Sequence, residues 1–201
     1  HHSLDMADWS LDIPHIYTTV ANVMGNRTSG PWGKNKACSE SIEPESMQYS
    51  VGGKAFQIAP NQFHNGDFLF SHESGQENLY EDSSGKFGSQ VTRITKSNWK
   101  FECFSFRHRD GQMMEGFIGY SPSGLKYTFN QPIRTRIKLA PMRALDSVNP
   151  IYMHARYLYV SKIEDRFGNK IEYQFNENQL TSIVASDGRK VDFQYHVTTM
   201  N

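Results

Sequence analysis

Two short motifs in this chain contain residues that perform chemistry in other proteins. His108-Arg109-Asp110 matches three letters of the kinase catalytic loop, in which the aspartate accepts the proton of the substrate hydroxyl. A kinase also needs a glycine-rich loop, a strand lysine and a DFG metal site, and the sequence contains none of them. Because Asp-Gly is a strong hairpin signal, Asp110-Gly111 is interpreted as a turn.

The segment 119–124, Gly-Tyr-Ser-Pro-Ser-Gly, is close to the nucleophile elbow of hydrolases. Its glycine spacing differs from that of the elbow, a proline follows Ser121, and no helical pattern comes next. Ser121 is therefore interpreted as a turn residue, and the sequence predicts no catalytic residue and no enzyme.

The histidines do not show the spacing of metal ligands. Asp165 and Asn169 carry oxygen ligands that suit calcium, but such side chains at a hairpin tip more commonly bond the local backbone. The sequence also lacks a phosphate-binding glycine loop. We therefore predict no metal and no cofactor.

The composition narrows the class of protein further. The 201 residues carry 21 basic and 21 acidic side chains, so the net charge is zero, which argues against nucleic acid as a partner. An aromatic content of 13% argues against disorder and suits strands. No apolar run is long enough to span a bilayer, and no signal peptide is recognised.

The elements that would position any site are clearest in residues 160–195, where one unit is written twice. At an offset of twenty residues, Gly168 matches Gly188, Lys170 matches Lys190, and the alternating segment 171–175 matches 191–195. A fixed period of this kind indicates a repeat architecture.

Each unit is predicted to be a β-hairpin. Ile171, Tyr173 and Phe175 alternate with polar residues, which places the apolar side chains on one face of a strand. Glycine at each tip tolerates the positive φ of a tight turn. The predicted fold is all-β, with antiparallel hairpins forming a curved, repeat-built sheet (a partial β-shell) and long loops in the N-terminal half.

The chain divides into three predicted parts. Residues 1–6 resemble a tag remnant, residues 7–156 form a pre-repeat β region with loop insertions, and residues 157–201 hold two repeats. Within the second part, residues 21–50 are predicted to be a long loop and residues 51–70 a hairpin with strands near 54–58 and 68–70. A short helix is predicted between Pro141 and Pro150.

The repeat residues resemble the YD repeats of the Rhs (rearrangement hotspot) family, whose units read D-x-x-G-N-x-x-x-Y-x-Y-D-x-x-G-x-L. Residues 9–17 and 121–130 also resemble segments that precede those repeats. The chain departs from the pattern at Phe175, Asn176 and His196. The signature residues are Asp165, Arg166, Phe167, Gly168, Asn169, Tyr173 and Leu180 in the first unit and Asp187, Gly188, Arg189 and Tyr195 in the second.

This resemblance implies a non-catalytic structural part of a bacterial polymorphic toxin, secreted or at the cell surface. Its hairpins would build a β-shell that encloses a C-terminal toxin-like domain. Its partners would be the remaining repeats and the C-terminal domain of the same full-length chain. The family's self-cleavage motif is not reproduced, because Ser121 stands where an aspartate is needed.

Two questions about individual side chains stay open at this level. In an exported shell protein, Cys38 and Cys103 form either a disulfide or two buried thiols; a bridge over so long a loop stabilises the fold by about 4 kcal/mol.

The alternative function is a cell-surface carbohydrate-binding module. Its candidate ligand-binding aromatics lie in loop-like segments: Trp32, Tyr49, Tyr80 and Tyr152.

Overall fold

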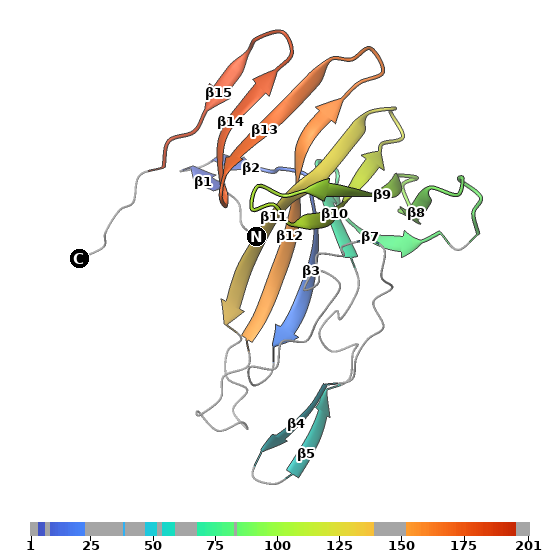
Figure 1. Cartoon of the computed structure of the whole chain (residues 1–201), viewed down its shortest axis with the longest axis vertical. Helices are drawn as coiled ribbons and strands as arrows, with labels where there is room; N and C mark the ends of the chain where they lie inside the picture. The colour runs from blue at the N-terminus through green and yellow to red at the C-terminus, as the bar shows by residue number, and fades with distance from the viewer. Residues whose placement is uncertain are drawn as a thin grey trace.

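The computed structural model of the chain describes residues 4–6, 9–22, 38, 47–51, 54–58, 68–82, 84–138 and 152–195. Every regular element in these residues is a strand (Figure 1). The prediction of an all-β, antiparallel fold is therefore confirmed. No helix in this part of the chain could span a membrane. The helix predicted for 141–150 and most of the loop predicted for 21–50 lie outside the described residues.

Strands of three to thirteen residues follow one another along the chain. They are β1 (Leu4–Met6), β2 (Trp9–Leu11), β3 (His15–Asn22), β4 (Met47–Val51), β5 (Lys54–Ile58), β6 (Phe68–His72), β7 (Gly75–Glu81), β8 (Val91–Ile94), β9 (Lys100–Arg107), β10 (Met113–Tyr120), β11 (Lys126–Lys138), β12 (Tyr152–Glu164), β13 (Lys170–Asn176), β14 (Gln179–Ala185) and β15 (Lys190–Asp192).

Eight of these strands close into a barrel. From β6 to β12 each strand pairs antiparallel with the next, β3 pairs with β6, and β12 returns to pair with β3. The closing contact runs from Tyr152 opposite Asn22 to Tyr159 opposite His15. The predicted hairpin over residues 51–70 was wrong: β5 pairs with β4 in a separate sheet, while β6 joins the barrel.

Strand β12 belongs to the barrel and to the repeat sheet at once. One of its edges pairs with β11 along its whole length. Its other edge pairs with β3 over residues 152–159 and with β13 over residues 162–164. Bulges between Thr128 and Gln131 shift the register where β12 changes partner, and a bulge bends a strand and increases its twist. The predicted domain boundary between residues 156 and 157 falls inside this strand.

Aromatic rings fill the barrel interior. Phe68, Phe70, Phe101, Phe117 and Phe129 are all fully buried. The ring of Phe70 contacts those of Phe101 and Phe129 edge to face, at centroid distances of 5.1 and 5.8 Å. The alternation of apolar and polar residues along β6, β9, β10 and β11 produces this core, because every second side chain points inward.

A glycine makes room for two of these rings. Gly119 faces inward on β10, directly opposite Phe101 on β9. A Cβ atom at Gly119 would lie 2.8 Å from Phe101 Cε1 and 3.0 Å from Phe129 Cε2. Since real Cβ contacts are not that short, the rings of both phenylalanines occupy the volume that a side chain at position 119 would need.

A second aromatic row lies on the opposite face of β3 and β12. Ile16 and Leu158 are buried in the core, so His15, Tyr17, Tyr157 and Tyr159 on the same strands face the other way. Tyr17 stacks on its cross-strand partner Tyr157 at 5.5 Å. Burial lowers the pKa of His15 and raises the pKa of Tyr159 to about 12. Both side chains are therefore uncharged at neutral pH, as packing residues should be.

Candidate functional site

Five hairpin turns share one backbone geometry. In each turn the amide of the first residue donates to the carbonyl of the fifth, and the amide of the fourth donates to the carbonyl of the first. The fourth residue has a positive φ, between 69° and 90°. The five turns begin at Thr95, His108, Ser121, Asp165 and Ala185.

A side-chain oxygen completes every one of these turns by accepting a hydrogen bond from the amide of the fifth residue. The acceptor is the first residue in three turns, Thr95, Ser121 and Asp165, at 3.2, 3.0 and 2.9 Å. It is the third residue in the other two, Asp110 and Asp187, at 3.0 and 3.1 Å. Ser, Thr and Asp recur at these positions because a short polar side chain can reach the local backbone.

The two motifs that suggested catalysis are both members of this set. Asp110 accepts from the Gln112 amide, and its second contact is His108 Nδ1 at 3.0 Å. These two contacts lower the pKa of Asp110. Ser121 accepts from the Leu125 amide at the start of its own turn. The interpretation of both segments as turns is confirmed.

We expect the Gly188→Ala variant to lose about 1–2 kcal/mol of unfolding free energy, because a Cβ atom is strained at φ 90°. No atom outside the neighbouring residues lies within 4 Å of the point that this Cβ would occupy, so the loss would report backbone strain alone. Urea unfolding measures it. The matched control is Asn98→Gly, which removes a side chain at φ 69° and should not destabilise. Equal stability of Gly188→Ala and the parent chain would contradict the role assigned to the turn.

The repeat seen in the sequence is also a repeat of structure. The turn at Asp165–Asn169 connects β12 to β13, and the turn at Ala185–Arg189 connects β14 to β15. The two turns have the same backbone hydrogen bonds at an offset of twenty residues. Strand β13 pairs with β14, so both hairpins lie side by side in one sheet (Figure 1). The predicted hairpins and their adjacency are confirmed, but β15 ends at Asp192, before the end of the strand predicted for residues 191–195.

One face of this sheet carries paired charges. Lys162–Glu164, Lys170–Glu172 and Lys190–Asp192 are ion pairs of 2.8 Å between residues two apart on the same strand. The last two pairs correspond at the twenty-residue offset. Exposed ion pairs contribute little to stability, so their regular placement is more informative than their energy.

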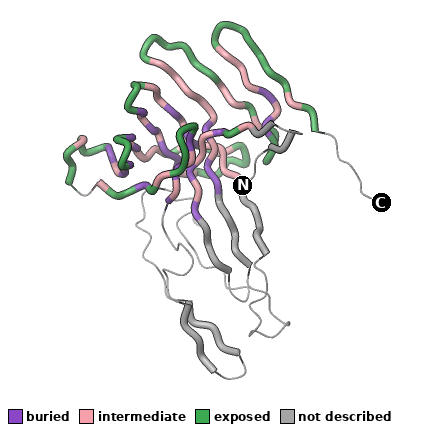
Figure 2. Tube along the Cα trace, turned by 180° about the vertical axis from the view of Figure 1, so that it is seen from behind, coloured by how far each residue is buried: buried purple, intermediate pink, exposed green. Residues whose placement is uncertain are grey.

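The opposite face carries apolar residues, and the hairpin tips beyond them are exposed (Figure 2). Tyr173 and Ile183 are partly buried and pack against the core. Ile171, nearer a hairpin tip, is 39% exposed, and Val191, which pairs with Ile183 on the edge strand β15, is 55% exposed. The apolar face of the repeats is therefore only half covered by the described residues.

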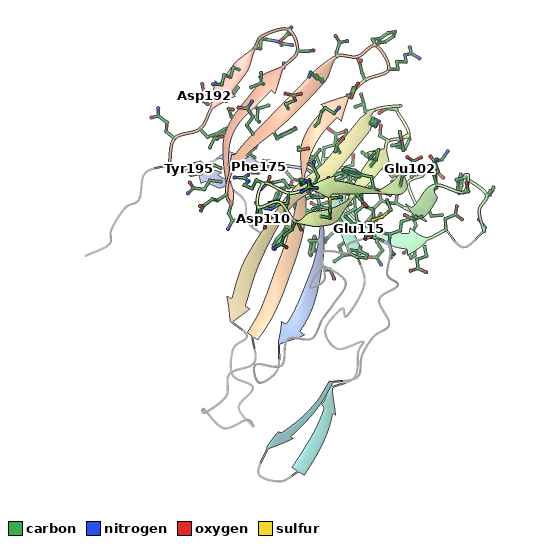
Figure 3. All side chains as sticks on the ribbon, viewed as in Figure 1. Glu102, Asp110, Glu115, Phe175, Asp192 and Tyr195 are labelled. Carbon is green, nitrogen blue, oxygen red and sulfur yellow. A yellow bond between two sulfur atoms is a disulfide. The ribbon has the colours of Figure 1, made fainter. Side chains whose placement is uncertain are left out.

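The barrel holds the base of the repeat sheet. Arg109, in the β9–β10 turn, donates to the carbonyl of Phe175, at 3.2 Å. Gln131 on β11 donates to the carbonyl of Glu177, at 3.0 Å. Leu180 is 2% exposed, and its carbonyl accepts from the hydroxyl of Tyr195 at 2.8 Å. Figure 3 shows Asp110 and Phe175 near this junction.

The last strand has an edge that no described strand covers. Strand β15 ends the sheet order and pairs only with β14. The Phe193 amide donates to the Thr181 carbonyl, and the Arg189 carbonyl accepts from the Ala185 amide, so these groups of residues 189 and 193 point toward β14. Backbone groups alternate in direction along an antiparallel strand, so Lys190 and Asp192 direct theirs away from β14. These two residues offer a site for a further strand.

The four aromatic candidates for sugar binding have different outcomes. Trp32 lies outside the described residues. Tyr49 lies on β4 and Tyr152 at the start of β12, and neither side chain is described. Tyr80, on β7, is 41% exposed, with the Lys96 ammonium 5.9 Å from its ring centroid. Tyr80 is therefore the one described side chain among the four.

A cleft of about 420 Å³ lies elsewhere on the barrel. Tyr120 pairs directly with Lys100 across β10 and β9, which brings two separate turns together. The Tyr120 hydroxyl donates to the Glu102 carboxylate at 3.1 Å. Burial, and to a smaller extent this hydrogen bond, raises the pKa of Tyr120. Sequence reasoning missed this cleft because only the strand register assembles it. Its lining residues are Phe87, Ile94, Thr95, Asn98, Trp99, Lys100, Tyr120, Ser121 and Pro122.

Cys38 and Cys103 form a disulfide, so the first of the two alternatives left open by the sequence is the one in the structure. The bridge spans a sequence separation of 65 residues, with the Cα atoms 5.7 Å apart. Cys103 lies on β9, and Cys38 is buried with the core residues at 6% exposure. The bridge therefore fixes one point of the segment between β3 and β4 to the barrel wall.

Comparison of the chain with protein-family models, with curated proteins and with solved structures gives no match.

Proposed function

We propose that this chain is a non-catalytic structural module of a YD/Rhs-repeat protein, secreted or at the bacterial cell surface. In this proposal the barrel carries the first two hairpins of a β-shell, and later repeats extend the sheet from β15. The completed shell encloses a C-terminal, toxin-like domain of the same full-length chain. The partners are those later repeats and that domain.

The observation that carries the proposal is the structural repeat with an open end. Two hairpins with the same turn, the same ion pair and the same alternation lie side by side, and the second directs the backbone groups of Lys190 and Asp192 outward. A repeat unit buries its edges and apolar face only against a neighbour. The half-covered apolar face that includes Val191 fits the same explanation.

The test is to append a third unit, a copy of residues 176–195, after Tyr195, and to measure hydrogen exchange at single-residue resolution. We expect the Lys190 and Asp192 amides to exchange at least about tenfold more slowly in the extended chain, because a new strand would protect them. The control extension has the same length, with proline at the two positions whose amides would pair with β15.

Unchanged exchange at Lys190 and Asp192 would show that the sheet ends at β15, and the shell proposal would fail. Enclosure is tested separately in the full-length protein. If protease cleaves the C-terminal domain as fast in the full-length protein as in isolation, the shell does not enclose that domain. Extension of the sheet from β15 would still be supported.

A second candidate function is carbohydrate binding, and the cleft beside Tyr120 is the observation that favours it. It combines aromatic rings with the amide of Asn98 and the ammonium of Lys100, and sugar-binding sites use such groups. The Lys100 ammonium lies 4.9 Å from the Phe87 ring centroid, so one ring face already has a cation over it. A glycan array run with the parent chain and with Lys100→Ala tests this function; saturable binding lost in the variant supports it, and a blank array rejects it.

A further inference from the structure

A carboxylate lies beside the disulfide on the barrel wall (Figure 3). Glu115 and Phe117 project from the same face of β10, and Phe117 is paired directly with Cys103 on β9. The disulfide brings Cys38 to the same place. The sulfur atoms of both cysteines and a carboxylate oxygen of Glu115 all lie within 4.8 Å of one another. Catalytic zinc sites also use three protein ligands, with an open fourth position.

The distance from sulfur to oxygen fits a tetrahedral zinc ion. Zinc bonds of about 2.3 Å to sulfur and about 2.1 Å to a carboxylate oxygen, at the tetrahedral angle, place those two atoms about 3.6 Å apart. Cys38 Sγ and Glu115 Oε2 are 3.6 Å apart. The carbonyl oxygen of Gly116 also lies near the same sulfur, at 3.4 Å.

The carboxylate is also held in position by the backbone. The Cys38 amide donates to Glu115 Oε2 at 3.0 Å, the same oxygen that faces the sulfur. A hydrogen bond of this kind orients a metal ligand before the metal arrives. Cys38 therefore supplies one sulfur atom and, through its backbone amide, also directs the Glu115 carboxylate toward that sulfur.

We propose that reduction of the Cys38–Cys103 disulfide converts this place into a zinc(II) site, with the two thiolates and the Glu115 carboxylate as ligands. A dithiol reductant supplies two electrons and two protons; the S–S bond breaks, and the reductant becomes a disulfide. Each cysteine thiol then releases its proton to solvent as zinc binds. The sulfur atoms separate to about 3.8 Å, the spacing of two thiolates on tetrahedral zinc.

In this proposal Cys38 is linked to β9 in either of two ways, by a disulfide or through a zinc ion. In an oxidising compartment the disulfide ties Cys38 to β9, whereas in a reducing compartment, where disulfides are rare, zinc makes the same connection. The inference is independent of the proposed shell function, because it rests on Cys38 and on two barrel side chains, Cys103 and Glu115, and on none of the repeat sheet.

The test is a zinc count on the reduced and oxidised chain. The chain is reduced with dithiothreitol, exchanged anaerobically into metal-free buffer, given zinc, freed of unbound metal and measured by atomic emission. We expect about one zinc ion per reduced chain and less than about a tenth of that in the disulfide form. Cobalt(II) in place of zinc should give thiolate charge-transfer absorption and the spectrum of a tetrahedral ion.

Two glutamine variants make the test specific. Glu115→Gln should weaken zinc binding at least about tenfold, because it replaces an anionic ligand by a neutral amide. Glu102→Gln is the matched control: Glu102 lies on β9 next to Cys103 but projects from the other face, and its carboxylate accepts from Tyr120. It should bind zinc as the parent chain does.

Circular dichroism spectra of the reduced chain, recorded before and after zinc is added, show whether reduction unfolds the chain and whether zinc restores the fold. Recovery of the β spectrum with one equivalent of zinc would support the site. A reduced chain that takes up no zinc, folded or not, overturns the proposal, and so does equal zinc affinity in the parent and Glu115→Gln.

Discussion

Replacing Phe129 by alanine should lower the free energy of unfolding by about 3–5 kcal/mol, the usual cost of removing a buried phenylalanine ring. Phe129 is fully buried, and its ring contacts those of Phe70 and Phe101. It also lies on a strand that is paired along both edges, since β11 pairs there with both β10 and β12. The cavity left by the ring is therefore bounded by strands that have little freedom to collapse into it.

Chemical denaturation with urea measures this loss as a shift of the transition midpoint at unchanged slope. The matched control is Phe167→Ala. Phe167 is 74% exposed at a hairpin tip, with the Arg166 guanidinium 4.7 Å from its ring centroid, so its loss should cost no more than about 0.5 kcal/mol. If both variants lost the same free energy, the assignment of Phe129 to the core would be wrong.

Removing the disulfide should have a comparable effect. We expect the double variant Cys38→Ser/Cys103→Ser to unfold with about 4 kcal/mol less free energy, because the bridge restricts a long loop of the unfolded chain. The sequence separation of 65 residues sets that estimate. The double variant leaves no unpaired thiol that could be oxidised elsewhere.

Thermal unfolding of the double variant, of the parent chain and of the parent chain reduced in metal-free buffer distinguishes the causes. The reduced parent and the double variant should unfold at similar temperatures, both well below the oxidised parent. A double variant as stable as the oxidised parent would mean that the segment carrying Cys38 is held without the bridge. Addition of zinc should then raise the unfolding temperature of the reduced parent chain only, because the double variant has no thiolate ligands.

The sequence by itself determined the local features of this protein. Alternation along 171–175 and 191–195, with glycine at 168 and 188, predicted two adjacent hairpins, and the structure has them. The same reasoning assigned Asp110 and Ser121 to turns instead of catalysis. These features depend on side-chain direction and on backbone φ within a few residues, and both can be judged from neighbouring residue types.

Closure of the barrel was decided only by the tertiary structure. The curved sheet was predicted, but nothing in residues 15–22 or 152–159 specifies that those strands pair with each other across more than a hundred positions. The wrong pairing predicted for β5 and β6 has the same origin, since adjacency in sequence favoured a hairpin that the barrel does not contain.

Both candidate sites were also decided by the tertiary structure. The Tyr120 cleft and the place where Glu115 meets the cysteines each combine separate segments; the β9–β10 register contributes to both, and the disulfide brings Cys38 to the second. Alternation determines which face a side chain occupies, but a register is fixed only when the strands pack around a shared core. For that reason the sequence could predict the hairpins and their turns, while the barrel and its two sites required the folded chain.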